Sequence, residues 1–391
     1  MAKVLILGSF SRSLIQFRGH LIRRLLDEDH QVVAAAPDFD DDVRRALDVW
    51  GVQCRSVSMD RRGINPVRDL ETLWQLHSLF SAEKPDVFFG YTIKPVIYGL
   101  LAAWLADVPS RYAMITGVGS AFTQTQTLRQ LLLQNLASML YRLSLRTSNR
   151  VIFHNPDDAY LFCARRLVGG PEQLAIVNGS GVDLDEFRPA PFPEQTSYLL
   201  IGRLLYTKGI REYAMAARKI RSCHPDVRFR LCGWPDDGPS AISSQELDDW
   251  ISDGTIEYLG HLDDVRPAIA DASVYVLPSY REGTPRTVLE AMAMGRPIIT
   301  TDVAGCRQTV EPGENGFLVP HRNEDALARA MTHFIGEPQL VESMGSASRR
   351  LAEHRFDVEE VTDSLLVTLG LGQRRLPPPL PADMVSVQPQ S

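Results

Sequence analysis

Two α/β domains in series, each built on a doubly wound parallel sheet, are the fold that this sequence predicts. Short apolar runs typical of buried strands alternate with helical patterns along the chain. This alternation favours parallel sheets with helices on both faces. The chain has 391 residues, more than one ordinary hydrophobic core holds. The alternation also restarts after residue 193, which indicates a second sheet.

The predicted strands form two series. The first series comprises residues 4–7, 32–36, 52–57, 87–89, 112–115, 151–153 and 174–177, and the second comprises residues 198–201, 229–232, 256–259, 274–277, 298–300 and 317–319. The proline-rich stretch 189–193 between them is the predicted linker. We therefore expect an N-terminal domain over 1–185 and a C-terminal domain over 186–355. In doubly wound folds ligands bind at the carboxyl ends of the strands, which predicts a site in a cleft between the two domains.

The end of the chain predicts a last helix and a tail. Residues 358–371 carry an amphipathic pattern, and we assign the segment 356–372 to a C-terminal helix that can cross back to the N-terminal domain. A proline-rich and polar end predicts a disordered tail over 373–391.

Composition favours an ordinary globular enzyme or binding protein of the cytoplasm. Hydrophobic residues make up 44% of the chain and charged residues 23%, as in soluble globular proteins. The five cysteines are odd in number and contain no C-x-x-C spacing, which argues against a disulfide framework or a structural zinc site. The short apolar run at the N-terminus predicts a buried strand rather than a signal peptide, and no apolar run is long enough to span a membrane.

The stretch 280–290 places two carboxylates around the predicted start of a helix. Glu282 falls in the loop and Glu290 on the helix, with Thr284 as the predicted N-cap and Pro285 at the first helical position. The N–H groups of a helix N-terminus bind phosphates, so one acid could hold a ribose and the other the group beyond a diphosphate. The alternative, a capped surface helix with two solvated glutamates, stays open at this point.

Two cations follow the first strand of the second series. Arg203 and Lys208 lie five positions apart on a loop that leads into a helix. Fixed Arg and Lys donors can stabilise a leaving nucleoside diphosphate without a metal. Solvated loop cations are the alternative, but both glutamates in the same half favour a site.

Three further signals are weaker. Gly233 ends the next strand and permits either close approach to a ligand or a turn. Asp183 and Asp185 could chelate Mg²⁺ or Mn²⁺, although local capping is the favoured interpretation. The pair Gly117 and Gly119 lacks the third glycine of a dinucleotide-binding motif, so it is poor evidence for NAD.

The segment 111–150 is basic. No acidic residue lies between Asp107 and Asp157, and the arginines there are Arg111, Arg129, Arg142, Arg146 and Arg150. Apolar residues recur within it at helical spacing, namely Leu128, Leu131, Leu132, Leu136, Met139, Leu140 and Leu143. Both a helix at an anionic membrane surface and an ordinary core-facing helix fit this pattern. Nucleic acid is not an expected partner, because aromatic interleaving is absent and the net charge is −7.

The second half resembles the retaining nucleotide-sugar glycosyltransferases of family four, which have the GT-B fold. The motifs are Gly202-Arg203, Lys208-Gly209, the run Val276-Leu-Pro-Ser-Tyr-Arg-Glu-Gly-x-Pro-x-x-Val-Leu-Glu-Ala, Gly295-x-Pro-Ile-Ile and Asn315-Gly-Phe. The first half, through residues 91–99 and 115–119, is similar to a bacterial branch that extends undecaprenyl-diphosphate-linked saccharides. The resemblance implies two Rossmann-like domains that face a cleft. It also implies transfer of a hexose or N-acetylhexosamine, best guessed as N-acetylgalactosamine, from a UDP-sugar.

The resemblance also implies roles for single residues. Arg203 and Lys208 would hold the diphosphate, and Glu282 the transferred sugar. The remaining nucleotide-binding positions are Gly202, Gly233, Gly283, Thr284, Leu289 and Glu290, with Glu290 on the ribose. The acceptor-side positions are Arg18, Lys94, Thr116 and Gly117; many family members carry histidine at the position matched to Thr116. No metal and no cofactor besides the donor sugar is expected.

These inferences predict a cytoplasmic enzyme bound peripherally to the inner membrane face through the segment 111–150. A nucleotide-sugar epimerase on the same fold is one alternative, and it would need no acceptor. A non-enzymatic nucleotide-sugar-binding protein is another.

Overall fold

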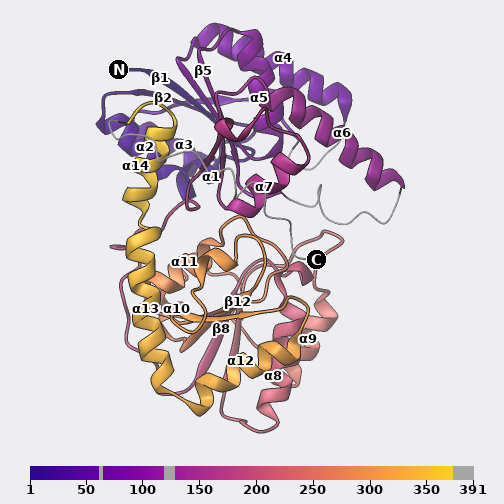
Figure 1. Cartoon of the computed structure of the whole chain (residues 1–391), viewed down its shortest axis with the longest axis vertical. Coiled ribbons are helices and arrows are strands. Elements are labelled where there is room, and N and C mark those ends of the chain that lie inside the picture. The colour runs from indigo at the N-terminus through magenta and orange to yellow at the C-terminus, as the bar shows by residue number, and fades with distance from the viewer. Residues whose placement is uncertain (61–64, 119–127, 373–391) are drawn as a thin grey trace. The chain divides into compact units, whose positions relative to one another are not determined.

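The computed structural model describes residues 1–60, 65–118 and 128–372, and it contains two compact α/β units (Figure 1). Unit 1 comprises Met1–Ser180 together with the chain from Val361 onward, and unit 2 comprises Gly181–Glu360. Each unit has its own parallel sheet covered by helices on both faces, so the predicted two-sheet α/β architecture is confirmed. The predicted tail 373–391 and Gly119 lie outside the described residues.

Unit 1 contains a seven-stranded parallel sheet in the order β3-β2-β1-β4-β5-β6-β7. Its strands are β1 (Lys3–Leu7), β2 (Gln31–Ala36), β3 (Gln53–Ser56), β4 (Val87–Tyr91), β5 (Ser110–Ile115), β6 (Arg150–Phe153) and β7 (Leu174–Ile176). Val4 of β1 lies between Val32 and Val87 of its two neighbours. The strand order reverses between β1 and β4, where such sheets form ligand sites.

Helices cover both faces of this sheet because β1 sends alternate side chains to opposite faces. Leu5 and Leu7 face α4 (Pro66–Glu83), α5 (Ile93–Leu105), α6 (Leu128–Leu145) and α7 (Pro156–Ala164). Val4 and Ile6 face α1 (Arg12–Gln16), α2 (Gly19–Asp27), α3 (Asp41–Val49) and α14 (Val358–Thr368). A short 3₁₀ turn, η2 (Pro171–Gln173), precedes β7.

The last helix of the described chain begins in unit 2 and packs on unit 1. Val361, Leu365 and Leu366 of α14 lie in the core on the α1–α3 face of the unit 1 sheet. Asp363 of the same helix forms an ion pair of 3.1 Å with Arg24 of α2. This part of α14 therefore shares the core of unit 1, although it lies far along the sequence.

Unit 2 contains a six-stranded parallel sheet in the order β10-β9-β8-β11-β12-β13. Its strands are β8 (Ser197–Ile201), β9 (Arg228–Cys232), β10 (Glu257–Tyr258), β11 (Val274–Leu277), β12 (Ile298–Thr301) and β13 (Gly316–Val319). One face carries α8 (Ile210–Arg221), α9 (Ser244–Ser252) and α12 (Glu324–Gly336), and the other carries α10 (Arg266–Ala270) and α11 (Arg286–Ala293). The long α13 (Gln339–Arg355) contacts both α11 and α12, and short 3₁₀ turns η3 (Tyr206–Lys208) and η4 (Arg307–Thr309) occur in loops.

The proline-rich stretch 189–193 is not a free linker. The Arg296 guanidinium is fully buried, donates to the carbonyl of Pro191 at 2.9 Å and lies 4.6 Å from the centre of the Phe192 ring. The stretch is therefore packed into unit 2, and the contact boundary between the units falls earlier, between Ser180 and Gly181. Composition alone could not reveal this, because the anchoring arginine is remote in sequence.

Candidate active site

The predicted donor-site residues of unit 2 lie at the carboxyl ends of three neighbouring strands. Gly202 and Arg203 follow β8, Gly233 follows β9, and Glu282 lies in the loop that leaves β11. In this sheet the strand order reverses between β8 and β11. The carboxyl ends of β9, β8 and β11 therefore lie at the reversal, which is where α/β sheets bind ligands.

Lys208 and Glu282 form an ion pair in this position. The Nζ of Lys208 donates to the Oε1 of Glu282, and both side chains are mostly buried. The Ser279 hydroxyl donates to the same carboxylate oxygen at 2.7 Å. The Glu282 carboxylate is therefore held by two donors from two different loops, which fixes the direction it faces.

The loop that carries Glu282 is held by its neighbours. The backbone N–H of Tyr280 donates to Thr207 at 2.9 Å, and that of Glu282 donates to Ala304 at 3.0 Å. Gly209 has a φ of +73°, and a Cβ there would lie 2.1 Å from the carbonyl oxygen of Pro278. Only glycine permits this approach of the Lys208 turn to the Glu282 loop.

Arg203 is held by a residue that the sequence analysis missed. One guanidinium nitrogen of Arg203 donates to the Oδ2 of Asp236 at 3.0 Å, and the Arg203 side chain stays partly exposed. Asp236 lies in the loop after β9, three residues after Gly233. A pairing between residues 33 positions apart in adjacent loops leaves no signal in local sequence.

The backbone geometry at the end of β9 requires glycine at position 233. Its φ is +153°, and a Cβ there would lie 1.8 Å from the carbonyl oxygen of Gly202. The close approach that the sequence suggested is thus made to the backbone of the neighbouring strand. Whether a nucleotide also approaches Gly233 stays a prediction.

Helix α11 begins at Arg286, later than predicted. Pro285 occupies the N-cap position with an extended ψ of 109°, and no side chain caps the helix. The Thr284 hydroxyl instead donates to the carbonyl of Gly283 at 3.0 Å, so the prediction of Thr284 as N-cap was wrong. The extended backbone at Pro285 moves the start of the helix one residue later, and the N–H groups of Val288 and Leu289 both donate to the carbonyl of Pro285.

Glu290 is almost completely buried on α11. The residue is 6% exposed, and its carboxylate accepts a 2.8 Å hydrogen bond from the Nε of Arg286, one turn earlier. Burial raises the pKa of Glu290, and the charge of Arg286 partly opposes this rise. Leu289 beside it belongs to the hydrophobic core, and its N–H donates to the carbonyl of Pro285. A role for Leu289 in binding a nucleotide stays a prediction.

Arg18, one of the predicted acceptor-side residues, is buried in unit 1. It precedes α2, is 3% exposed, and places its guanidinium 5.0 Å from the centre of the Tyr91 ring. It donates to the Ser180 hydroxyl at 3.4 Å and contacts the sulfur of Met114 at 2.7 Å, while its Nε has no hydrogen-bond partner among the described residues. Burial lowers the pKa of Arg18 to about 10.

The other acceptor-side residues also belong to unit 1. Lys94 is the second residue of α5 and forms a 2.6 Å ion pair with Asp69 of α4, so its charge is already balanced. Thr116 and Gly117 directly follow β5. The sequence analysis missed His154, which follows β6, is buried and lies 3.3 Å from the Met114 sulfur. Burial and the charge of Arg18 lower the pKa of His154 to about 3, so its imidazole is neutral.

The described residues contain neither a metal-binding cluster nor a helix that could span a membrane. Within residues 1–60, 65–118 and 128–372, no group of three or more His, Cys, Asp or Glu is placed to hold a metal ion. The carboxylate of Asp183 accepts from the N–H groups of Asp185 and Glu186, as in a local cap. In the same described ranges, no helix combines the length and the apolar character needed to cross a bilayer.

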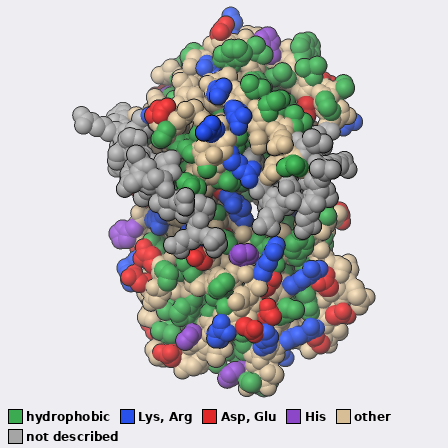
Figure 2. All heavy atoms as spheres, turned by 45° about the vertical axis from the view of Figure 1, so that its right-hand side comes forward, with side chains coloured by type: hydrophobic (Ala, Val, Ile, Leu, Met, Phe, Trp, Pro, Cys, Tyr) green, Lys and Arg blue, Asp and Glu red, His purple; other side chains and the backbone are tan. Residues whose placement is uncertain are grey.

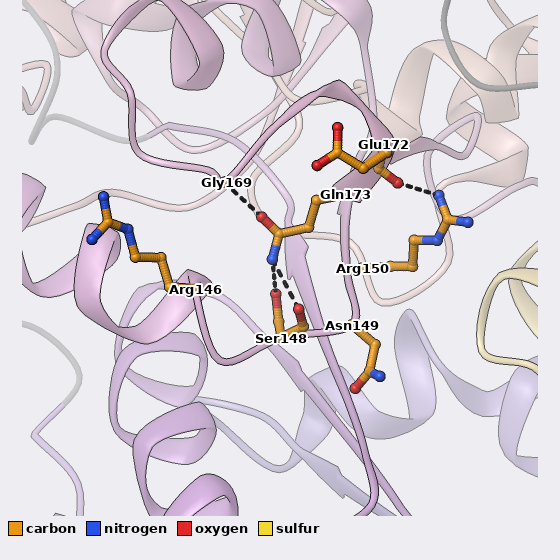
Figure 3. Close-up of a pocket in the computed structure, with 7 residues that line it drawn as sticks. All are labelled: Arg146, Ser148, Asn149, Arg150, Gly169, Glu172 and Gln173. Atoms are coloured by element: carbon orange, nitrogen blue, oxygen red, sulfur yellow. Dashed lines mark hydrogen bonds between the residues drawn. The ribbon is translucent and has the colours of Figure 1, made fainter.

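A separate pocket of about 410 Å³ opens at the amino ends of β6 and β7 in unit 1 (Figure 3). Gln173 lies at its centre and donates to the carbonyls of Leu145 and Ser148 while accepting from the N–H of Gly169. Its rim carries Arg146, Arg150 and the acidic Glu172. The pocket lies at the opposite end of the sheet from Thr116 and His154, and it contains none of the predicted site residues.

Comparison with known proteins supplies the family. The family model for "Glycosyl transferase 4-like domain" matches residues 16–179, and that for "Glycosyl transferases group 1" matches residues 195–337. The chain is 25% identical over 342 residues to the N,N'-diacetylbacillosaminyl-diphospho-undecaprenol alpha-1,3-N-acetylgalactosaminyltransferase of Campylobacter jejuni, covering 84% of this chain and 88% of the relative. It is 26% identical over 345 residues to the UDP-Gal:alpha-D-GlcNAc-diphosphoundecaprenol alpha-1,3-galactosyltransferase of Escherichia coli, covering 84% of each chain.

Solved structures agree on the fold. HepE of Anabaena, crystallised in complex with UDP and glucose, superposes with a TM-score of 0.76 at 18% identity, covering 95% of this chain and all of that one. Sucrose-phosphate synthase of Thermosynechococcus elongatus superposes with a TM-score of 0.75 at 18% identity, covering 93% of this chain and 96% of that one. The two family matches, the two parallel sheets and these superpositions agree with the motifs around Arg203, Lys208, Glu282 and Glu290. The chain is therefore a group 1 glycosyltransferase of family four, a retaining family with the GT-B fold.

Proposed function

We propose that this glycosyltransferase moves a hexose or N-acetylhexosamine from a UDP-sugar to an undecaprenyl-diphosphate-linked saccharide during polysaccharide or glycan biosynthesis. The names of the Campylobacter and Escherichia relatives support this acceptor class. The UDP bound to HepE supports the donor nucleotide. N-acetylgalactosamine is the leading candidate for the transferred sugar, because the Campylobacter relative is named for it.

The observation that carries the proposal is the Lys208–Glu282 pair at the strand ends, with Arg203 at the start of the loop that carries Lys208. Lys208 and Arg203 would bind the diphosphate oxygens and stabilise the negative charge that gathers on UDP as it leaves. The backbone at Gly283 and Thr284, directly before α11, would add N–H donors. In the absence of the UDP-sugar, Glu282 balances the charge of Lys208. When the UDP-sugar binds, Lys208 would contact both Glu282 and the diphosphate.

The two glutamates would divide the donor between them. Glu290 would hold the ribose hydroxyls, and its hydrogen bond with Arg286 fixes the carboxylate in one orientation. Glu282 would hold the transferred sugar near its anomeric carbon. In the front-face mechanism that the family resemblance implies, the departing phosphate oxygen takes the proton of the acceptor hydroxyl, so the protein need not supply a base.

The acceptor would be bound by unit 1. Arg18 is a buried cation that the described residues leave without a carboxylate partner, and such a cation is stabilised when an anion binds. It is the stronger candidate for the acceptor diphosphate, since Lys94 already pairs with Asp69. Thr116 and Gly117 would line the same end of the sheet. A lipid-linked acceptor also fits a peripheral enzyme on the inner membrane face that binds through the segment 111–150.

Transfer assays on site variants test the donor site. With a panel of UDP-sugars and a diphosphate-linked acceptor, Lys208→Met and Glu282→Gln should each lower kcat/KM by about 10²- to 10³-fold, since each removes a group that contacts the transferring sugar phosphate. Lys219→Ala is the matched control: this lysine of α8 also forms an ion pair, with Asp325, but lies at the far end of the helix. It should keep normal activity.

The same assays separate the alternatives. Normal transfer by both site variants would refute the donor site. Release of an epimerised sugar from UDP-sugar alone would favour an epimerase. Tight binding of a UDP-sugar, seen as a raised melting temperature, without turnover on any acceptor would favour a binding protein.

A further inference from the structure

Tyr280 lies two residues before Glu282 and is hydrogen-bonded to the chain on both sides of Lys208. Its backbone N–H donates to the carbonyl of Thr207 at 2.9 Å, and its hydroxyl donates to the Oε1 of Glu212 at 2.6 Å. Thr207 directly precedes Lys208, and Glu212 lies in the first turn of α8, four residues after Lys208. The two hydrogen bonds therefore hold the Lys208 turn against the loop that carries Glu282.

Glu212 is a buried carboxylate that depends on Tyr280 for its hydrogen bonding. The residue is 9% exposed, and its Oε2 has no hydrogen-bond partner among the described residues. Arg211, the preceding residue, pairs instead with Glu246 at 2.7 Å. On the face of unit 2 that Figure 2 shows, acidic and basic side chains lie next to one another, and such exposed pairs contribute little because water screens them. A buried carboxylate has no such screening, so losing its donor is costly.

The Tyr280 ring is packed against side chains from two other loops. The Arg322 guanidinium, in the loop after β13, lies 4.7 Å from the centre of the ring. The centre of the His321 ring lies 6.0 Å away, and that of the Tyr206 ring lies 6.2 Å away. Burial and the hydrogen bond to Glu212 raise the pKa of Tyr280 to about 12, so the phenol keeps its proton and remains the donor. The Tyr280 side chain is therefore fixed in one orientation.

Ser279, the residue before Tyr280, connects this arrangement to the Lys208–Glu282 ion pair. The Ser279 hydroxyl lies 3.2 Å from the carbonyl oxygen of Thr207 and 2.7 Å from the Oε1 of Glu282. Since Ser279, Tyr280 and Glu282 belong to one short loop, a shift of Tyr280 would also move the Glu282 carboxylate relative to Lys208. A displacement of about 1 Å at groups that contact reacting atoms can cost about 10²-fold in rate.

We propose that Tyr280, through its hydrogen bond to Glu212, is a positioning residue that fixes the geometry of Lys208 and Glu282 for sugar transfer. The inference rests on the proposed function, in which Lys208 holds the donor diphosphate and Glu282 the transferred sugar. In this role Tyr280 contacts no substrate. Its loss should therefore lower kcat more than it raises KM for the UDP-sugar.

Steady-state kinetics of variants on both sides of the hydrogen bond test the role. Tyr280→Phe removes the donor and Glu212→Leu the acceptor, and each should lower kcat by about 10- to 100-fold while changing KM for the UDP-sugar by less than about threefold. The double variant Tyr280→Phe/Glu212→Leu should lose no more than either single variant, because the same hydrogen bond is absent in all three. Glu212→Gln keeps an oxygen that can accept from Tyr280, so its kcat should stay within about threefold of the wild type.

Tyr198→Phe is the matched control for a loss of stability alone. The Tyr198 hydroxyl donates to the carbonyl of Met331 at 2.7 Å in the core of unit 2, and the residue lies near the amino end of β8. Tyr198→Phe and Tyr280→Phe each lose one hydrogen bond of a tyrosine hydroxyl, so each should lower the melting temperature. Only Tyr280→Phe should lower kcat when transfer is measured well below both melting temperatures.

Three outcomes would overturn the positioning role. Tyr280→Phe could melt earlier and still keep wild-type kcat, which would leave the hydrogen bond a purely structural part. The losses of the two single variants could multiply in the double variant, which would show that they act independently. A raised KM with unchanged kcat in Tyr280→Phe would mean that the hydroxyl binds the donor directly.

Failure of the positioning role and failure of the proposed function give different results. If Lys208→Met and Glu282→Gln both transfer sugar as the wild type does, the proposed donor site fails and the role of Tyr280 fails with it. If those two variants are impaired while Tyr280→Phe transfers normally, only the positioning role fails.

Discussion

Gly305 links the fold of unit 2 to the position of Glu282. It has a φ of +80°, and a Cβ built there would lie 2.3 Å from the carbonyl oxygen of Glu282 and 2.4 Å from that of Gly283. Folded proteins essentially never place a Cβ closer than 3.0 Å to such an atom, so Gly305→Ala must move the Glu282 loop by about 0.7 Å. A displacement of this size at a group that contacts the reacting atoms, the role proposed for Glu282, costs up to about 10²-fold in rate.

The stability cost has two parts that a control can separate. A left-handed backbone costs a non-glycine residue about 1–2 kcal/mol, and the overlap adds about 1–3 kcal/mol. Gly313 has a nearly equal φ of +83° with nothing within 4 Å of its Cβ position. Gly313→Ala should therefore lose only the first part and keep its kcat/KM.

Urea denaturation and initial transfer rates, measured on both variants, check this reasoning. Gly305→Ala should be less stable than Gly313→Ala and about 10- to 100-fold less active. Equal unfolding free energies together with wild-type activity in Gly305→Ala would show that the Glu282 loop is not held against residue 305.

Three other predictions concern buried polar groups. Burial lowers the pKa of His154 to about 3, so as the pH falls below about 6.5 only the unfolded chain takes up a proton there. The unfolding free energy should therefore fall by up to about 1.4 kcal/mol per pH unit, down to about pH 3, because of this residue. His154→Gln should remove that part of the slope in urea titrations at pH 7 and pH 5, and an unchanged slope would contradict a buried neutral imidazole. Arg296→Met removes the guanidinium that donates to the carbonyls of residues 191, 269 and 270 and should cost about 2–4 kcal/mol in chemical denaturation; a loss below about 1 kcal/mol would mean that water replaces the guanidinium. Tyr280→Phe removes the 2.6 Å hydrogen bond to Glu212, whose second carboxylate oxygen has no partner among the described residues, and it should lower stability by about 1–3 kcal/mol. Wild-type stability in that variant would show that solvent reaches Glu212.

Elements with strong local signals were predictable from sequence. Each of the thirteen predicted strands overlaps a strand of the structure, down to the two-residue β10, because apolar runs between helical patterns report burial on both faces. The start of α11 was placed too early at Thr284, since local preference for an N-cap could not anticipate the extended backbone of Pro285. The stretch 189–193 was predicted to be a free linker, but it packs against Arg296. Composition does not show a contact with a residue so far away in sequence.

The chain's own pattern of apolar runs, glycines and acid–base motifs was enough to determine two parallel sheets and the glycosyltransferase family, because these features depend on neighbours in sequence. Tertiary structure alone decided which charges meet. It paired Arg203 with Asp236 and Lys94 with Asp69, buried Arg18 beside His154, and left Trp74 and Trp104 exposed. The physical reason is that ion pairing, burial and exposure are set by residues brought together from distant parts of the chain, and local sequence carries no record of which distant residues those are.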